Sequence, residues 1–268
     1  MRAPGQNAKG KSVVLRLSAN LGFLFADQPL PEAIRAARAA GFDAVECHWP
    51  YDVDPGAVRA ALVETGLSMV SLNTGRGSRD DDFGLAAVPG REIEARAAIS
   101  AAIAYGQTIG AASVHVLAGR AAGEAAARTF EANLAFACEC AAPHGMTVLI
   151  EPLNPQDAPG YYLIGLDMAV SIIERLARPE LKILFDCYHQ QITGGDLFRR
   201  FAAHLQMIGH VQFAGVPDRG VPNAGEVAFD RLLPALQDLG YAGPFGAEYR
   251  PAGATEDSLG WMSAFRRP

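Results

Sequence analysis

Residues 143–151 read PHGMTVLIE: a helix-like stretch ends, a glycine follows, and a short apolar run ends on a polar residue. The same order recurs as AAGFDAVEC at 39–47, ETGLSMVSL at 64–72, TIGAASVHV at 108–116 and DLGYAGPFGAE at 238–248. Glycine often ends a helix because it adopts a positive φ at little steric cost. The repeat therefore predicts helices and strands that alternate along the whole chain.

The alternation predicts strands at residues 13–19, 43–47, 67–72, 112–117, 146–151, 181–186, 207–213 and 244–248. Helices are expected at 29–40, 55–65, 91–109, 124–143, 166–178, 196–204 and 229–239. Eight units without a break in composition, in a chain of 268 residues, indicate a single (β/α)8 TIM barrel. We expect a flexible leader at 1–12 and the barrel at 13–268. A doubly wound sheet is the second choice, because no glycine-rich phosphate turn follows the first strand.

Polar residues stand at the ends of the expected strands. They are Asn20, Glu46 or His48, Asn73, His115, Glu151, Asp186, Gln212 and Glu248. In a TIM barrel these ends meet at one mouth, where active sites form. A buried polar group without a partner costs about 1–3 kcal/mol, so a ring of them is most simply explained by a shared ligand.

Four of these residues predict a metal site: Glu151, Asp186, Gln212 and Glu248. Carboxylate and amide oxygens suit one hard divalent cation, Mg²⁺ or Mn²⁺. Three carboxylates packed together would raise one another's pKa unless a cation neutralised them. A single glutamate at a strand end more often forms a salt bridge or caps a helix, and it is the combination that favours a metal.

Other residues near this mouth are candidates for contacts with a substrate. His189 lies three residues after Asp186, although a loop histidine satisfied by backbone is the plain alternative. Arg219, in the loop after the seventh strand, suits a substrate carboxylate through a bidentate pair. His115 either binds substrate or fills a barrel layer, and Asn73 is a further candidate.

Two more features of the sequence bear on the site. His210 alternates with Gln212 along one strand, so both side chains should point inward, with His210 one layer deeper as a core or orienting residue. The stretch at 73–92 is too long for an ordinary connection, and such loops are usually functional lids or disordered.

Composition excludes several classes of protein. The net charge is −6 and no basic cluster occurs, so nucleic acid is not an expected partner. No apolar run reaches the roughly 18–20 residues of a membrane span. The four cysteines show no CxxC spacing, which fits a reduced, cytoplasmic setting.

Six phrases of the sequence resemble a known family: SANLGFLFADQPL, GFDAVE, GLAAVPGRE, VHVLAG, GHVQFAGVPDRGVPNAGE and GYAGPFGAEYRPAG. The family is that of hydroxypyruvate isomerase and 2-oxo-tetronate isomerase, within the xylose-isomerase-like TIM barrels. The resemblance covers about residues 14–265. It implies one divalent metal on Glu151, Asp186, Gln212 and Glu248, with Glu151 and Glu248 as the acid/base pair. His189 and Arg219 would contact substrate.

The activity implied is the aldose–ketose isomerisation of a small sugar acid by proton transfer through a cis-enediolate. A ketose 3-epimerase is the first alternative, although such epimerases carry histidine where Gln212 stands. An endonuclease IV-like metallonuclease would need more histidines and a basic face. A sugar-acid sensor without activity would not need both glutamates. A homo-oligomer stays open, since barrels of this type often pair.

Overall fold

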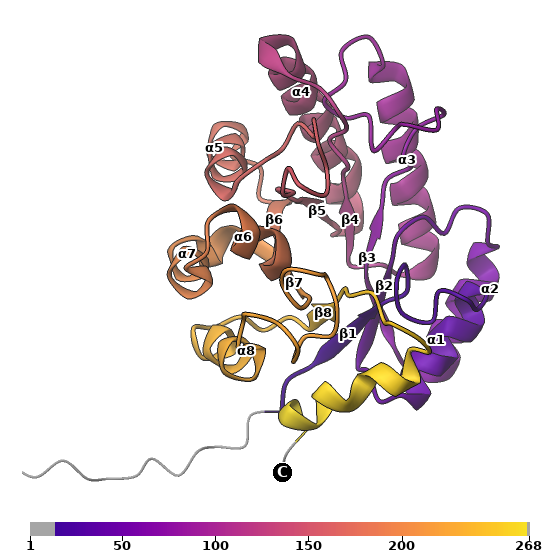
Figure 1. Ribbon diagram of the computed structural model, residues 1–268. Coiled ribbons are helices and arrows are strands. Elements are labelled where there is room, and N and C mark those ends of the chain that lie inside the picture. Colours follow the sequence, from indigo (N-terminus) through magenta and orange to yellow (C-terminus); the bar gives the residue numbers. More distant parts are fainter. Residues whose placement is uncertain (1–13, 267–268) are drawn as a thin grey trace, which may run out of the picture.

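The chain folds into one closed barrel of parallel strands surrounded by helices, as the computed structural model of residues 14–266 shows (Figure 1). The expected leader at 1–12 lies outside the described residues. The strands are β1 (Leu17–Asn20), β2 (Ala44–Cys47), β3 (Ser68–Asn73), β4 (Ser113–His115), β5 (Thr147–Ile150), β6 (Leu181–Asp186), β7 (Ile208–Phe213) and β8 (Phe245–Ala247). They pair in sequence order, and β8 closes the ring against β1. The predicted TIM barrel is confirmed.

The helices form the outer layer. They are α1 (Leu30–Ala39), α2 (Pro55–Thr65), α3 (Glu92–Ile109), α4 (Gly123–Ala141), α5 (Leu166–Leu176), α6 (Cys187–Thr193), α7 (Leu197–His204) and α8 (Phe229–Asp238). Short 3₁₀ segments follow at η1 (Ala142–His144), η2 (Leu205–Met207) and η3 (Glu256–Phe265). The strands are mostly buried on both faces, as a parallel sheet covered by helices requires. No helix in the described part of the chain is long and apolar enough to cross a bilayer.

Glycines end the helices as predicted. The residue after α2, Gly66, has φ 69°, and the residue after α3, Gly110, has φ 75°. Both lie in the left-handed region, where a side chain would be strained. The chain can therefore turn sharply from each helix into the next strand.

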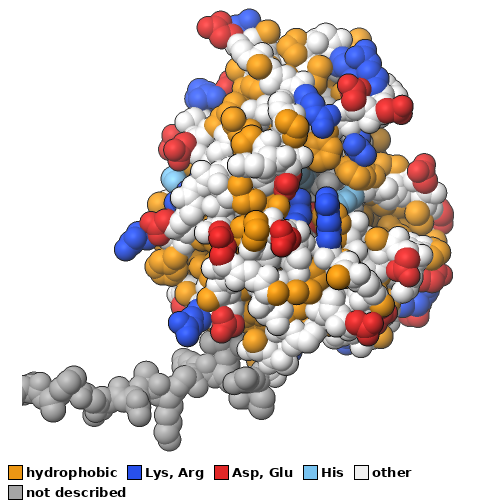
Figure 2. All heavy atoms as spheres, viewed as in Figure 1, with side chains coloured by type: hydrophobic (Ala, Val, Ile, Leu, Met, Phe, Trp, Pro, Cys, Tyr) orange, Lys and Arg blue, Asp and Glu red, His pale blue; other side chains and the backbone are white. Residues whose placement is uncertain are grey.

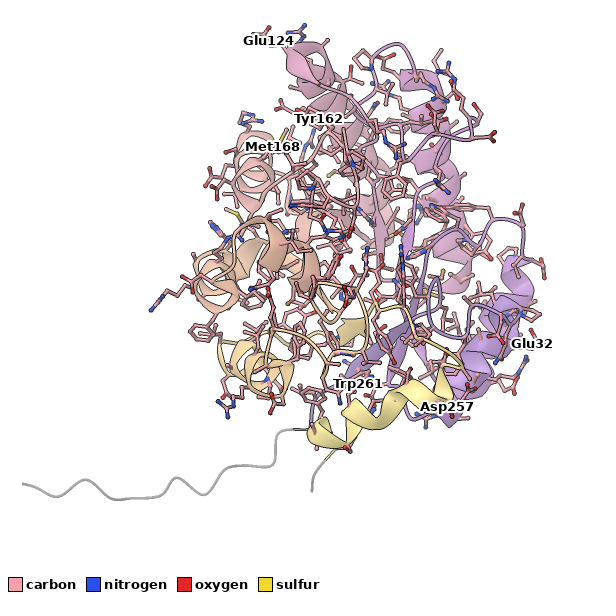
Figure 3. The ribbon with its side chains drawn as sticks, in the orientation of Figure 1. Glu32, Glu124, Tyr162, Met168, Asp257 and Trp261 are labelled. Atoms are coloured by element: carbon pink, nitrogen blue, oxygen red, sulfur yellow. The ribbon has the colours of Figure 1, made fainter. Side chains whose placement is uncertain are left out.

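Helix α6 and segment η3 were not predicted. Helix α6 begins directly after Asp186, so His189 lies on a helix and not on a loop. Asp186 itself caps this helix, accepting a hydrogen bond from the backbone N–H of Tyr188 at 2.9 Å. Segment η3 crosses the lower edge of the molecule in Figure 1, where Trp261 packs 5.4 Å from the ring of Phe213 (Figure 3). It ties the C-terminal part of the chain to the barrel.

The long connection after β3, residues 74–91, is ordered and packed. Its Leu85 is buried, and the backbone N–H of Ala86 donates to Leu117 O in the loop after β4. Arg91 holds the loop through ion pairs at 2.5 Å to Asp82 and 2.7 Å to Glu94. These contacts join the loop to α3 and to the loop after β4, and its Phe83 lines the cavity at the barrel mouth.

Candidate active site

The C-terminal ends of the strands surround a cavity of about 360 Å³. Figure 2 shows a hollow near the centre of the viewed face, with basic and histidine side chains beside it. Phe23, Trp49 and Phe83 supply aromatic walls. Four residues predicted to contact substrate line the cavity, namely Asn73, His115, His189 and Arg219. Glu151 and Glu248 line it as well.

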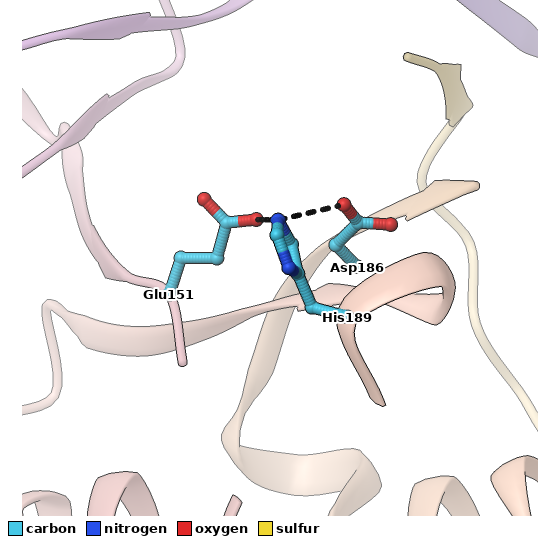
Figure 4. A group of neighbouring side chains, drawn as sticks. All are labelled: Glu151, Asp186 and His189. Atoms are coloured by element: carbon cyan, nitrogen blue, oxygen red, sulfur yellow. Dashed lines mark ion pairs between the residues drawn. The ribbon is translucent and has the colours of Figure 1, made fainter. Parts of the chain in front are cut away.

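Three carboxylates are buried at the strand ends. Glu151 follows β5, Asp186 ends β6, and Glu248 follows β8. Their exposed fractions are 6%, 0% and 6%, so water does little to screen them. One potential ligand atom from each of Glu151, Asp186 and His189 lies within 4.8 Å of the other two (Figure 4). Gln212 stands beside Asp186 in the β6–β7 register, which brings the fourth predicted ligand to the same end of the barrel.

Glu248 is held on both of its oxygens. Asn20 Nδ2 donates to Oε1 at 2.9 Å, and His48 Nε2 lies 3.0 Å from the same atom. Arg219 Nη2 donates to Oε2 at 2.6 Å. Burial alone would raise the pKa of Glu248, but the charge of Arg219 and the hydrogen bond from His48 lower it to about 2. Glu248 is therefore ionised at neutral pH.

Glu151 and Asp186 are shifted the other way. Burial, together with the charges of Glu248 and Asp186, raises the pKa of Glu151 well above its usual range. Burial raises the pKa of Asp186 to about 7, although the charge of Arg219 opposes this shift. One guanidinium cannot compensate three buried carboxylates, so this side of the site favours an additional positive charge or proton.

The hydrogen bonds of His189 fix its tautomer. The backbone N–H of Asn154 donates to His189 Nδ1 at 3.1 Å, so Nδ1 is an acceptor. Burial, with the charge of Arg219, lowers the pKa of His189 to about 3, and the neutral ring therefore carries its proton on Nε2. Nε2 lies 3.6 Å from Asp186 and 3.8 Å from Glu151. A protonated nitrogen cannot ligate a metal, so His189 is better suited to donate a hydrogen bond to substrate.

His115 and Asn73 form a pair across β3 and β4. His115 Nδ1 lies 3.2 Å from Asn73 Oδ1, and the two residues are register partners. Burial lowers the pKa of His115 to about 4, so the ring is neutral. With Nδ1 donating to Asn73, Nε2 carries a lone pair, and it has no partner among the described residues. That atom can accept a hydrogen bond.

A second polar group fills the barrel interior below the cavity. Glu46 Oε2 lies 2.7 Å from His210 Nε2 and accepts from Gln212 Nε2 at 3.2 Å. The inward direction predicted for His210 and Gln212 is thus confirmed. Gly246 on β8 makes room for this group, because a Cβ there would lie 2.1 Å from Glu46 Oε1. Since Nε2 of Gln212 points at Glu46, the Oε1 atom of Gln212 is left without a partner among the described residues.

The oxygen donors fit a divalent cation. Glu151 Oε1 and Gln212 Oε1 are buried and have no hydrogen-bond partner within residues 14–266. Buried polar atoms are rarely left unpaired, and these two belong to the set whose carboxylates also need positive charge. The fold and the carboxylate cluster are therefore compatible with a metal.

Sequence reasoning did not single out two cavity residues, His48 and Arg250. His48 was named only as an alternative to Glu46, yet both belong to polar clusters at the barrel end. Arg250 lines the cavity two residues after Glu248. Period-two alternation from Glu248 would have placed Arg250 on the same side, and this was the available signal.

A second hollow, of about 440 Å³, lies on the outer side between α8 and η3. It is lined by Asp230 and Glu226 together with apolar residues around Trp261. None of the polar strand ends reaches it. The chemistry of the molecule is therefore centred on the barrel mouth.

Comparisons with known proteins agree with this geometry. The profile of the family "Xylose isomerase-like TIM barrel" matches residues 34–265. The 2-oxo-tetronate isomerase of Cupriavidus necator is 39% identical, over 93% of this chain and 98% of that protein. The hydroxypyruvate isomerase of Escherichia coli is 34% identical, over 94% of this chain and all of that protein. A crystal structure from Brucella melitensis, described as an AP endonuclease of family 2, superimposes with a TM-score of 0.90 at 37% identity, covering 94% of this chain and 100% of that chain.

The closed barrel and its polar mouth thus define a xylose isomerase-like TIM barrel. The sequence identity to the two isomerases is above 30% over nearly the full length of the chain, and it defines the family within this class. The chain belongs to the hydroxypyruvate isomerase and 2-oxo-tetronate isomerase family, and it is an isomerase.

Proposed function

We propose that the protein is a metal-dependent aldose–ketose isomerase of a small sugar acid. The substrate would be hydroxypyruvate, giving 2-hydroxy-3-oxopropanoate, or a 2-oxo-tetronate, giving its 3-oxo isomer. Relatives named for these two reactions cover nearly the whole chain. The observation that carries the proposal is the pair Glu151 and Glu248, two buried glutamates that follow β5 and β8 and line one cavity.

Two glutamates in one cavity allow separate roles in moving protons. Glu248 is ionised, so it suits the base that removes a proton from the substrate's hydroxyl-bearing carbon. Loss of this proton gives a cis-enediolate. Glu151 is the other carboxyl group that lines the cavity, and it suits the group that returns a proton to the former carbonyl carbon. A hydroxyl proton moves between the two oxygens, so the atoms balance.

Other residues would hold the substrate between the glutamates. His189 can donate from Nε2 to a substrate oxygen, and His115 lines the same cavity beside it. Asn73 orients His115 through the bond to Nδ1. Arg219 lines the same cavity and faces the carboxylates. The aromatic walls would shield one side of the bound substrate from bulk water.

A divalent cation, Mg²⁺ or Mn²⁺, would be held by Glu151, Asp186, Gln212 and Glu248. It would supply the positive charge that stabilises developing negative charge on the substrate oxygens, an effect worth several kcal/mol. Asp186 and Gln212 lie deeper than the two glutamates and do not line the cavity. Their role would therefore be to hold the ion, while the glutamates also move protons.

The proposal is tested by a coupled assay on hydroxypyruvate, the 2-oxo-tetronates and free ketoses. Mg²⁺, Mn²⁺ and a chelator are compared, because the proposal expects turnover of an acid that the chelator abolishes. Turnover of free ketoses alone would support the epimerase alternative. Isomerisation in D₂O should place solvent deuterium in the product. Full retention of the substrate hydrogen in the product would contradict exchange with solvent. In that case, substrate deuterated at the hydroxyl-bearing carbon would show whether the same hydrogen is passed to the neighbouring carbon while shielded from solvent.

A further inference from the structure

The cavity contains two guanidinium groups, and one of them is already bound by the protein. Arg219 Nη2 contacts Glu248 Oε2 at 2.6 Å and Asp186 Oδ2 at 3.3 Å, and its Nε donates to the backbone oxygen of Glu248 at 3.4 Å. Its guanidinium carbon also lies 5.0 Å from the ring centroid of Tyr188. The edge of the Arg219 guanidinium formed by Nε and Nη2 is thus occupied, and it could bind a substrate carboxylate only by releasing two buried carboxylates, which would be costly.

Arg250 is the other guanidinium, and it is free. Its side chain forms no hydrogen bond or ion pair with any residue between 14 and 266, and it is exposed at the cavity rim. The guanidinium carbon lies 5.4 Å from the ring centroid of Phe23, the same ring that Arg219 approaches at 5.2 Å. Stacking on an aromatic ring orients a guanidinium while leaving its in-plane N–H donors available.

The backbone that carries Arg250 is held firmly. Its N–H donates to Arg219 O at 2.7 Å. The preceding residue, Tyr249, is buried and its hydroxyl contacts Ser258 Oγ at 2.6 Å and Trp261 Nε1 at 3.2 Å. The backbone of Arg250 is therefore held in place, while its planar guanidinium has free N–H donors. It stands at the entrance to a cavity whose other charges are mostly negative.

We infer that Arg250 binds the carboxylate of the sugar acid and so makes the enzyme select acids over neutral sugars. This inference rests on the proposed function of the same cavity. A planar guanidinium matches a carboxylate through two parallel hydrogen bonds, which a neutral hydroxymethyl group cannot form. With the acid end held at the rim, the adjacent keto carbon points inward to the glutamates. Arg219 then remains with Glu248 and Asp186 instead of leaving them for the substrate.

The first test compares an acid with its neutral analogue. Erythrulose carries a hydroxymethyl group where a 2-oxo-tetronate carries its carboxylate. Arg250→Gln should raise KM for the acid about 10- to 100-fold, the range expected for a lost charge-assisted hydrogen bond, with a smaller change in kcat. The kcat/KM for erythrulose should stay unchanged. Arg250→Lys keeps the charge without the fork and should restore part of the affinity. Equal losses for acid and erythrulose would overturn the inference.

Arg76 provides a matched control for the effect of losing one positive charge near the cavity. It is exposed, stacks 5.0 Å from the Trp49 ring near the same mouth, and has no carboxylate partner among the described residues. Arg76→Gln removes the same charge, but Arg76 is not among the residues that line the cavity. If it weakened binding of the acid as much as Arg250→Gln does, recognition would depend on summed charge and not on Arg250.

A binding measurement separates this inference from the proposed reaction. Threonate has the carboxylate and hydroxyls of the four-carbon acids but no keto group, and threitol is its neutral counterpart. Calorimetry on the metal-loaded protein should show threonate binding that Arg250→Gln weakens. If this holds while no keto acid is turned over, the isomerase proposal fails and the role of Arg250 stands. Equal threonate binding by both proteins, or none by the wild type, would overturn the role of Arg250.

Discussion

Arg219 Nη2 lies 2.6 Å from Glu248 Oε2 and 3.3 Å from Asp186 Oδ2, so one guanidinium bridges two carboxylates predicted to ligate a metal. The side chains of Asp186 and Glu248 are buried, and the side chain of Arg219 is 13% exposed. Arg219 therefore supplies much of the positive charge that these acids need. A divalent cation at the same oxygens would share or displace this contact.

Replacing Arg219 should make the protein more dependent on metal. Removing one partner of a buried ion pair costs about 3–5 kcal/mol, so Arg219→Gln should lower the free energy of unfolding by roughly this amount in the presence of a chelator. Addition of Mn²⁺ should then raise Tm more in the variant than in the wild type, because Glu248 and Asp186 are no longer occupied. Arg231→Gln, at an exposed position on α8, controls for the lost charge. Equal Tm shifts in all three proteins would contradict competition between Arg219 and the metal.

Glu248→Gln should keep the fold and lose turnover. The amide preserves size but cannot accept a proton from carbon, so kcat should fall by at least about 10³-fold. Turnover is measured by the coupled assay and folding by circular dichroism. Glu256→Gln, on the exposed side of η3, serves as the matched control and should be as active as the wild type. Near-normal turnover of Glu248→Gln would remove Glu248 from the acid/base pair.

Gly246→Ala should destabilise the barrel. The added Cβ would lie 2.1 Å from Glu46 Oε1 and 3.0 Å from His210 Nε2, and these groups are held in the closed interior. Overpacking of this kind typically costs about 1–3 kcal/mol, which denaturant unfolding can measure. Gly260→Ala is the control, because nothing lies within 4 Å of its added Cβ. A variant at Gly246 as stable as this control would show that the Glu46 carboxylate moves freely.

The ion pair between Asp82 and Arg91 should stabilise the loop 74–91 in a pH-dependent way. The hydrogen bond from Arg91 lowers the pKa of Asp82 below its usual value. A lowered folded pKa means that the stabilisation is complete above the unfolded pKa, about 3.9, and is lost as pH falls through the folded value. Asp82→Asn should thus lower the free energy of unfolding at pH 7 by about 1.5–3 kcal/mol, and by progressively less below about pH 4. A difference from wild type that stays constant down to pH 3 would contradict this linkage.

Local patterns were sufficient to predict the barrel. The glycine at a helix end and the polar residue at a strand end both depend on residues that are close in sequence. For β5, the expected strand at 146–151 agrees with the observed Thr147–Ile150 to within one residue at each end. Helix α6 was missed because its sequence, CYHQQIT, is short and has little apolar periodicity. Its beginning is fixed by Asp186, which was interpreted only as a ligand.

Contacts between distant residues could not be predicted in the same way. Arg219 and Glu248 are 29 residues apart, and Glu46 reaches Gln212 across 166 residues. Such pairs depend on how the closed barrel brings β2, β7 and β8 together and on the space left by Gly246. The residue types at the mouth were therefore predictable, while their partners and protonation states required the three-dimensional arrangement.

The hydrogen bonds of Tyr249 to Ser258 and Trp261 have a practical consequence. They connect the last segment of the chain to the two neighbouring residues that face the cavity, Glu248 and Arg250. Deleting the segment that contains Trp261, or fusing a tag that displaces η3, would therefore loosen both Glu248 and Arg250. An affinity tag for studies of turnover is therefore safer at the other terminus.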